Sequence, residues 1–129
     1  MLKLHTYQLG TPRRCGEGLR VGVVRHLPRG VRKEDYARLD QFDVWFPNVA
    51  PSAELLRWVH EGPETRWTGF VERYVREMKQ PDSRHAIELL AEMAKRTPIS
   101  IGCFCSDESH CHRSILRKLI QQAAEAQQD

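Results

Sequence analysis

The chain has 129 residues, which predicts a single domain over residues 1–129 with room for a buried core. Its hydrophobic fraction of 40% and charged fraction of 29% exclude a disordered chain, and no apolar run reaches the ~18 residues needed to span a bilayer. The net charge of +3 permits an anionic ligand but does not by itself indicate binding to duplex nucleic acid.

Strands and loops are predicted to alternate in the first part of the chain. The segment LKLHTYQL alternates apolar and polar residues, which is typical of a strand. A glycine-containing loop, GTPRRCGEG, separates it from LRVGVV, whose β-branched residues predict a buried strand. The basic loop HLPRGVRKED then leads to a short third strand, FDVWF, which ends at Pro47.

Helices are predicted to dominate the middle. Ser52 can cap a short helix through its side-chain oxygen. The stretch from Thr65 to Lys79 is the clearest amphipathic helix, because its apolar residues recur at helical spacing along one face. Pro81 is expected to end it, and Asp82 or Ser83 to cap the next helix.

After Pro98, the run ISIGCF predicts a strand buried on both faces, and a last helix follows it. Strands that alternate with helices favour an α/β fold. We therefore predict a single-domain sandwich with a small, substantially parallel sheet flanked by helices.

The segment GCFCSDESHCHRSIL, residues 102–116, concentrates reactive side chains at the turn between this strand and this helix. It holds three of the four cysteines and two of the six histidines. Ligands of open α/β sheets bind beyond the carboxyl ends of the strands. A helix N-terminus at this place offers unpaired N–H donors and about half a positive charge, which favours anions.

Cys111 and His112 are the predicted catalytic residues of this turn. The field of the helix N-terminus favours the thiolate of Cys111, which makes it a candidate nucleophile with His112 as general base or polar partner. Both are expected to point inward, whereas the helical wheel places Arg113 at the outer rim, where its guanidinium can grip phosphate or carboxylate. Asp107 or Ser109 is available as the helix cap. If the LRVGVV strand neighbours the ISIGCF strand, the basic loop approaches the same turn. The predicted ligand-binding residues are Arg25, Arg29, Cys105, Ser109 and Arg113.

The cysteines allow other interpretations. Cys103 fits a passive thiol of a buried strand. A C-x-C pair followed by Cys-His can also bind zinc, with Cys15 or His110 as a fourth ligand, although the spacing is not that of a zinc ribbon and we assign no metal ligand. A redox pair of Cys105 and Cys111 across the turn is a further alternative. No sequence motif indicates a cofactor.

Four segments covering nearly the whole chain carry a resemblance to a known family. They are RVGVVRHLPRGVRKED, APSAELLRWVH, RWTGFVERYVREM and ISIGCFCSDESHCHRSILRKLI. Their order and spacing resemble the domain of unknown function 488 family and its YeaO-like branch. The chain departs from that branch at three places: Cys-His at residues 111–112 stands where Asn-His is frequent, Val24 stands where the family commonly has an acidic residue, and His-Leu at residues 26–27 replaces Leu-Trp.

The resemblance implies an α/β fold and a site, but no established reaction. If the family's acidic residue acts as a catalytic base, Val24 means that this chain lacks that base. The site implied by the matched positions comprises Arg25, Pro28, Arg29, Cys105, Cys111, His112 and Arg113.

Taken together, the sequence predicts a cytoplasmic α/β domain that binds an anionic small molecule, a nucleotide or another phosphate-bearing compound. The N-terminal segment lacks a signal peptide, so we expect reduced thiols and no membrane partner. If the protein is an enzyme, a thiol-dependent transferase or hydrolase fits the site. One alternative is a non-catalytic regulatory or interaction module with zinc-bound or core cysteines, and another is a nucleic-acid-binding protein that uses its basic loops.

Overall fold

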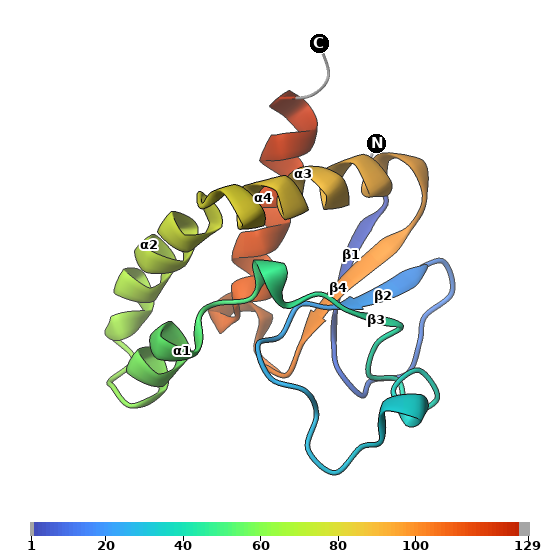
Figure 1. The fold of residues 1–129 in the computed structure, drawn as a ribbon, viewed down its shortest axis with the longest axis horizontal. Coiled ribbons are helices and arrows are strands. Elements are labelled where there is room, and N and C mark those ends of the chain that lie inside the picture. The colour runs from blue at the N-terminus through green and yellow to red at the C-terminus, as the bar shows by residue number, and fades with distance from the viewer. Residues whose placement is uncertain (1, 127–129) are drawn as a thin grey trace.

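The computed structural model describes residues 2–126 and shows a four-stranded sheet beside four helices (Figure 1). The strands are β1 (Leu4–Gln8), β2 (Leu19–Gly22), β3 (Val44–Trp45) and β4 (Ile99–Cys103). The helices are α1 (Ala53–His60), α2 (Arg66–Met78), α3 (Pro81–Arg96) and α4 (His112–Ala126). Three short 3-10 helices, η1 (Lys33–Asp35), η2 (Pro47–Val49) and η3 (Glu108–His110), lie in the connections. Among residues 2–126, no helix combines the length and the apolar character that a membrane span requires.

All neighbouring strands of the sheet are parallel, in the order β1-β4-β2-β3. The predicted α/β fold with a parallel sheet is therefore confirmed. β4 lies inside the sheet and all five of its residues are buried, as the unbroken apolar run predicts. Gln8 of β1 pairs with Cys103, and Gly22 of β2 pairs with Gly102, so three strands end at the same edge of the sheet.

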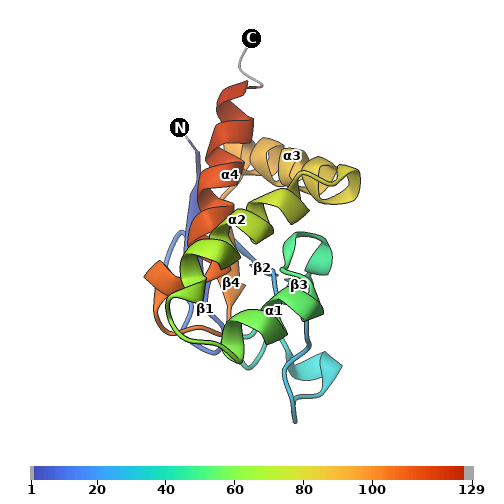
Figure 2. The ribbon, with the colours of Figure 1, turned by 90° about the vertical axis from the view of Figure 1, so that its left-hand side faces the viewer.

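The two faces of the sheet are covered differently. In Figure 1 the strands lie on the right and α1 and α2 on the left, with α4 between them; Figure 2 shows the same arrangement from the side. One face, with Ile99 and Ile101 of β4, packs against the helices in the main core. The other face is covered by aromatic side chains instead of helices. A Cβ at Gly22 would collide with the ring of Phe42, and one at Gly102 with the ring of Tyr7, so both glycines permit close packing of these rings.

The third strand is shorter than the predicted FDVWF. β3 holds only Val44 and Trp45, both exposed at the edge of the sheet. Phe42 turns onto Gly22, and the Asp43 carboxylate accepts a hydrogen bond from the Arg20 backbone N–H at 2.8 Å. Backbone pairing with β2 still continues on both sides of β3, since the Asp43 N–H donates to the Arg20 carbonyl and the Phe46 N–H to the Gly22 carbonyl, each at 2.9 Å.

All four predicted helices are present, and one predicted cap is wrong. Ser52 caps α1, since its Oγ accepts a hydrogen bond from the Leu55 N–H at 3.1 Å, and α2 falls within the predicted stretch. The predicted cap of α3 by Asp82 or Ser83 is wrong. α3 begins at Pro81 itself, whose fixed φ suits the first helical position, and Ser83 Oγ donates instead to the Asn48 carbonyl at 2.8 Å.

A buried ion pair lies on the face of the sheet that the helices do not cover. Arg20 of β2 has no exposed surface, and its guanidinium donates to the Glu17 carboxylate at 2.7 Å and 3.1 Å. It also lies 4.1 Å from the centre of the Tyr7 ring. This pair ties the loop after β1 to the sheet.

Candidate functional site

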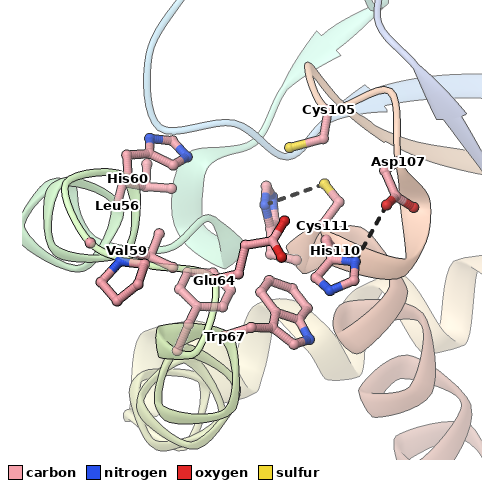
Figure 3. A pocket seen from close by; sticks show the side chains of 13 residues that line it. Leu56, Val59, His60, Glu64, Trp67, Cys105, Asp107, His110 and Cys111 are labelled. Carbon is pink, nitrogen blue, oxygen red and sulfur yellow. Dashed lines mark hydrogen bonds and ion pairs between the residues drawn. The ribbon is translucent and has the colours of Figure 1, made fainter.

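A pocket of about 380 Å³ opens beside the turn between β4 and α4 (Figure 3). Its walls come from α1, from α2 and from the loop that joins them, and its floor from the start of α4. Figure 3 shows Cys105 and Cys111 on one side of the pocket, with His60 across from them. The lining residues that carry polar or reactive groups are His60, Glu64, Trp67, Cys105, Asp107, His110, Cys111 and His112.

The turn that carries the thiols is built by its own polar residues. Asp107 caps η3, accepting hydrogen bonds from the Ser109 N–H at 3.0 Å and from its hydroxyl at 2.6 Å. These two bonds lower the pKa of Asp107, so its carboxylate stays charged at the pocket mouth. Cys111 has extended backbone and precedes α4, and its carbonyl accepts from the Ser114 N–H at 3.1 Å. Cys111 thus lies one residue before the first residue of α4.

His112 is buried, and its two ring nitrogens have different neighbours. Nε2 lies 2.6 Å from the Val23 carbonyl oxygen. That oxygen can only accept, so Nε2 carries the proton and Nδ1 keeps its lone pair. Nδ1 lies 3.9 Å from the Cys111 sulfur. Burial lowers the pKa of His112 to about 4, which keeps the ring neutral near pH 7. The predicted inward orientation of Cys111 and His112 is confirmed.

Arg113 does not lie at the rim, and that prediction is wrong. The residue is only 4% exposed, and its guanidinium folds back under the turn. Nη1 donates to the Cys105 carbonyl at 2.7 Å and lies 3.0 Å from the Cys103 sulfur and 3.8 Å from the Cys111 sulfur. The helical wheel fails here because it gives only the direction of the Cα–Cβ bond, and a long side chain can reverse that direction. A fixed positive charge therefore lies directly behind the two sulfur atoms.

Cys103 and Cys111 are brought together by the fold. The structure pairs their sulfur atoms as a disulfide, although their Cα atoms are 7.7 Å apart, so both residues act as thiols only after reduction. That separation is wider than the roughly 4.4–6.8 Å between the Cα atoms of most disulfides. Cys103 is buried in β4, as a strand thiol is expected to be, but its neighbours make it part of the site. The sulfur in contact with Cys111 belongs to Cys103 and not to Cys105, which the redox alternative paired with it.

Cys105 is a free, half-buried thiol that lines the pocket. Burial raises its pKa, although the Arg113 charge opposes this effect. Cys105 therefore stays protonated near neutral pH, which makes it a poorer nucleophile than a thiol held against the guanidinium.

The remaining predicted ligand-binding residues are not brought to the pocket. β2 neighbours β4, as expected, but the Arg25 guanidinium donates to the carbonyls of Pro47, Pro51 and Ala50 at 3.0–3.2 Å. Arg29 is exposed and does not line the pocket. Ser109 is exposed, and its hydroxyl donates to Asp107. Arg25 thus supports the backbone around η2, and Ser109 supports the Asp107 side chain within the turn.

Two pocket residues were missed by sequence reasoning. Trp67 follows the core-facing pattern of α2, and Glu64 lies in the short connection before that helix without any recognisable motif. In the structure Trp67 stacks on Phe70 with ring centres 5.0 Å apart and packs against the His110 ring at 5.2 Å. The Glu64 side chain points across the pocket toward Cys111 (Figure 3). A sequence signal for either role is absent, because the pocket forms only when α1 and α2 meet the β4–α4 turn.

The chain is similar to several known proteins. "Uncharacterized protein Rv3073c" of Mycobacterium tuberculosis is 36% identical over 105 residues, which are 81% of this chain and 80% of that protein. "Uncharacterized protein Mb3100c" of Mycobacterium bovis matches with the same identity and coverage. "Uncharacterized protein YeaO" of Escherichia coli is 30% identical over 105 residues, covering 81% of this chain and 85% of that protein. No solved structure matches the chain.

The match to a family covers most of the chain. The family described as "Active DUF488-N3 subclade" matches residues 4–124, which include all four strands, the pocket walls and most of α4. The chain therefore belongs to the DUF488 family, as a YeaO-like member.

Proposed function

We propose that the protein is a thiol-dependent enzyme, a transferase or a hydrolase, whose small-molecule substrate lies in the pocket beside the β4–α4 turn. The observation that carries the proposal is the alignment of Val23, His112 and Cys111. The Val23 carbonyl fixes the proton on Nε2, which leaves the Nδ1 lone pair facing the Cys111 sulfur. A nucleophile next to a base that a third group orients is the general arrangement of covalent catalysis. The word "active" in the family's description agrees with a catalytic role.

The proposed reaction uses this alignment in two steps. The Cys111 thiol gives its proton to His112 Nδ1, and the thiolate attacks an acyl carbon or a phosphorus atom of the substrate. A sulfur–substrate bond forms, and the leaving group departs with the proton from His112. Water or an acceptor alcohol or amine then attacks, losing its proton to Nδ1, and the sulfur–substrate bond breaks to regenerate the thiol. The Arg113 charge, 3.8 Å from the Cys111 sulfur, stabilises the thiolate before attack and after release.

A nucleotide or another phosphate-bearing compound is the proposed substrate class. The first N–H groups of α4 lack partners within the helix and favour negative charge, and Arg113 adds positive charge behind them. Trp67 and Phe70 offer an apolar aromatic wall on which a base can lie. Glu64 and Asp107 also line the pocket, and their carboxylates suit hydroxyl or amino groups of the substrate. The phosphate would therefore face the floor of the pocket, and the sugar or base its opening.

The experiment combines ligand screening with mapping of the reactive thiol. Reduced protein is screened by thermal shift against nucleotides, sugar phosphates and inorganic anions, and each hit is tested for protection of Cys111 from iodoacetamide by peptide mass spectrometry. A ligand at ~100 times its dissociation constant stabilises the native state by about 2.7 kcal/mol. We expect Cys111→Ala to abolish turnover of any compound that protects Cys111. The matched control is Cys15→Ala, which removes an exposed thiol outside the pocket. Turnover that survives Cys111→Ala would overturn the proposal.

A further inference from the structure

Three soft metal-ligand atoms meet at the floor of the pocket. The Cys103 sulfur, the Cys111 sulfur and one ring nitrogen of His112 lie within 4.8 Å of one another, and all three residues are buried. In a tetrahedral zinc site with Zn–S bonds of about 2.3 Å and Zn–N bonds of about 2.0–2.1 Å, ligand atoms lie roughly 3.3–3.8 Å apart. Small side-chain movements would therefore bring these atoms into a zinc site. Two thiolates and one neutral imidazole are the ligand types that zinc prefers.

The spacing of the two cysteines fits shared metal ligands better than a disulfide. Their Cα atoms are 7.7 Å apart, beyond the usual upper limit of about 7 Å for two cysteines that bridge without backbone movement. Two cysteines that bind the same ion can have Cα atoms farther apart than a disulfide allows, because the ion lies between their sulfur atoms. Cys103 lies at the end of β4 and Cys111 directly before α4. These two elements thus hold the reduced cysteines close enough to bind the same ion.

The groups around these atoms are those that support a metal. The His112 Nε2–H donates to the Val23 carbonyl, and a metal-binding histidine commonly makes this kind of bond with its second nitrogen. Nδ1 is left to face the two sulfurs. The Arg113 guanidinium, 3.0 Å and 3.8 Å from the sulfurs of Cys103 and Cys111, donates to them from the side and stabilises their anionic forms. These contacts would orient all three ligands before an ion arrives.

We propose that Cys103, Cys111 and His112 bind one Zn²⁺ ion, with its fourth position open to the pocket. Cys111 and His112 line that pocket, so water or a pocket ligand can complete the tetrahedron. Binding replaces two S–H bonds by two Zn–S bonds and releases two protons to solvent. This inference rests on the proposed function in one respect: the ion takes the Cys111 sulfur and the Nδ1 lone pair, so the zinc-bound and the nucleophilic states exclude each other. Zinc is then a reversible inhibitor of the thiol chemistry.

The test measures zinc binding and thiol reactivity separately on the full chain. Protein reduced with a phosphine and stripped with a chelator is titrated with Zn²⁺ against a chromophoric chelator. We expect one ion per chain and release of two protons. Cys103→Ser, Cys111→Ser and His112→Gln should each weaken binding by more than the about 10–100-fold that loss of an outer-shell partner causes. Cys15→Ser and Cys105→Ser should bind as the wild type does. Co²⁺ added to the wild type should give thiolate-to-cobalt charge-transfer absorption, which reports sulfur ligation without any variant that might misfold.

The outcomes separate this inference from the proposed function. One zinc ion per chain that slows alkylation of Cys111 by iodoacetamide supports the inference. No stoichiometric binding, no charge-transfer band, or unchanged alkylation of Cys111 at saturating Zn²⁺ overturns it. The nucleophile proposal fails on a different measurement, turnover by Cys111→Ala, and it survives if the protein binds no zinc. A metal that binds equally well after Cys103→Ser and Cys111→Ser lies elsewhere and also overturns the inference.

Discussion

Two arginines are buried in this small fold, and their surroundings differ. Arg20 donates to the Glu17 carboxylate and to three backbone carbonyls, those of Thr11, Pro12 and Asp40, at 2.7–3.2 Å. Arg113 has one backbone carbonyl at 2.7 Å and two sulfur atoms, and its carboxylate contact, to Glu108, is 3.4 Å long. Oxygen acceptors close the first site and fix the chain around it. At the second site the positive charge lies next to two sulfur atoms beside a pocket. There it can stabilise a negatively charged sulfur during a reaction.

The largest effect is expected from breaking the Arg20 site. Glu17→Ala removes the carboxylate that neutralises Arg20, and an ion pair broken in this way costs about 3–5 kcal/mol of folding free energy because a buried charge is left without its partner. Urea unfolding monitored by circular dichroism measures the loss. The control is Glu92→Ala, which removes an exposed ion pair with Lys95 and should change stability little. Equal losses in the two variants would contradict the structural role of Glu17.

The same carboxylate gives a pH dependence of stability. The hydrogen bonds from Arg20 lower the pKa of Glu17 from 4.5 to about 2. A carboxyl group with a lower pKa in the folded state contributes stability that is complete above the unfolded pKa and is lost as pH falls through the folded pKa. The free energy of unfolding should thus fall between about pH 4.5 and pH 2, by less than in Glu17→Ala, because a protonated carboxyl still accepts hydrogen bonds. A Glu17→Gln variant should show a flatter profile in this window, and an identical slope would exclude Glu17 as the cause.

A chemical effect is expected at the second site. Arg113→Met keeps much of the side-chain volume but removes the charge next to Cys111. Loss of a charge that lies 3.8 Å from the sulfur should slow alkylation of reduced Cys111 near pH 7, by about tenfold if the interaction is worth about 1.4 kcal/mol. Arg113→Lys keeps the charge and should recover part of the rate. Rates measured as a function of pH with peptide mapping distinguish this effect from a change in exposure, which would alter the rate at every pH. An unchanged rate in Arg113→Met would mean that the guanidinium is only a structural donor.

The comparison also shows what the sequence can predict. Parallel strands, the amphipathic α2 and the crowding of thiols at the end of β4 follow from local patterns, because apolar periodicity and strand-to-helix order determine them. The inward direction of Cys111 and His112 follows from the same periodicity. The position of Arg113 could not be predicted, since a long side chain chooses its partners after the backbone has folded. Neither could the walls of the pocket, which come from α1 and α2 and depend on how those helices pack.

The smallest effect is expected at Glu108, the distant carboxylate of Arg113, and it tests the comparison most finely. A hydrogen bond from Thr6 and the Arg113 charge lower the pKa of Glu108, but its side chain is 43% exposed. Solvent therefore screens the pair, and Glu108→Gln should cost about 0–1 kcal/mol, far less than Glu17→Ala. The alkylation rate of Cys111 should remain close to that of the wild type, because the thiols and not Glu108 are the close partners of the guanidinium. If Glu108→Gln instead raises that rate strongly, Glu108 neutralises much of the Arg113 charge in the wild type. Arg113 would then resemble Arg20, whose charge is neutralised by Glu17, more closely than the distances indicate.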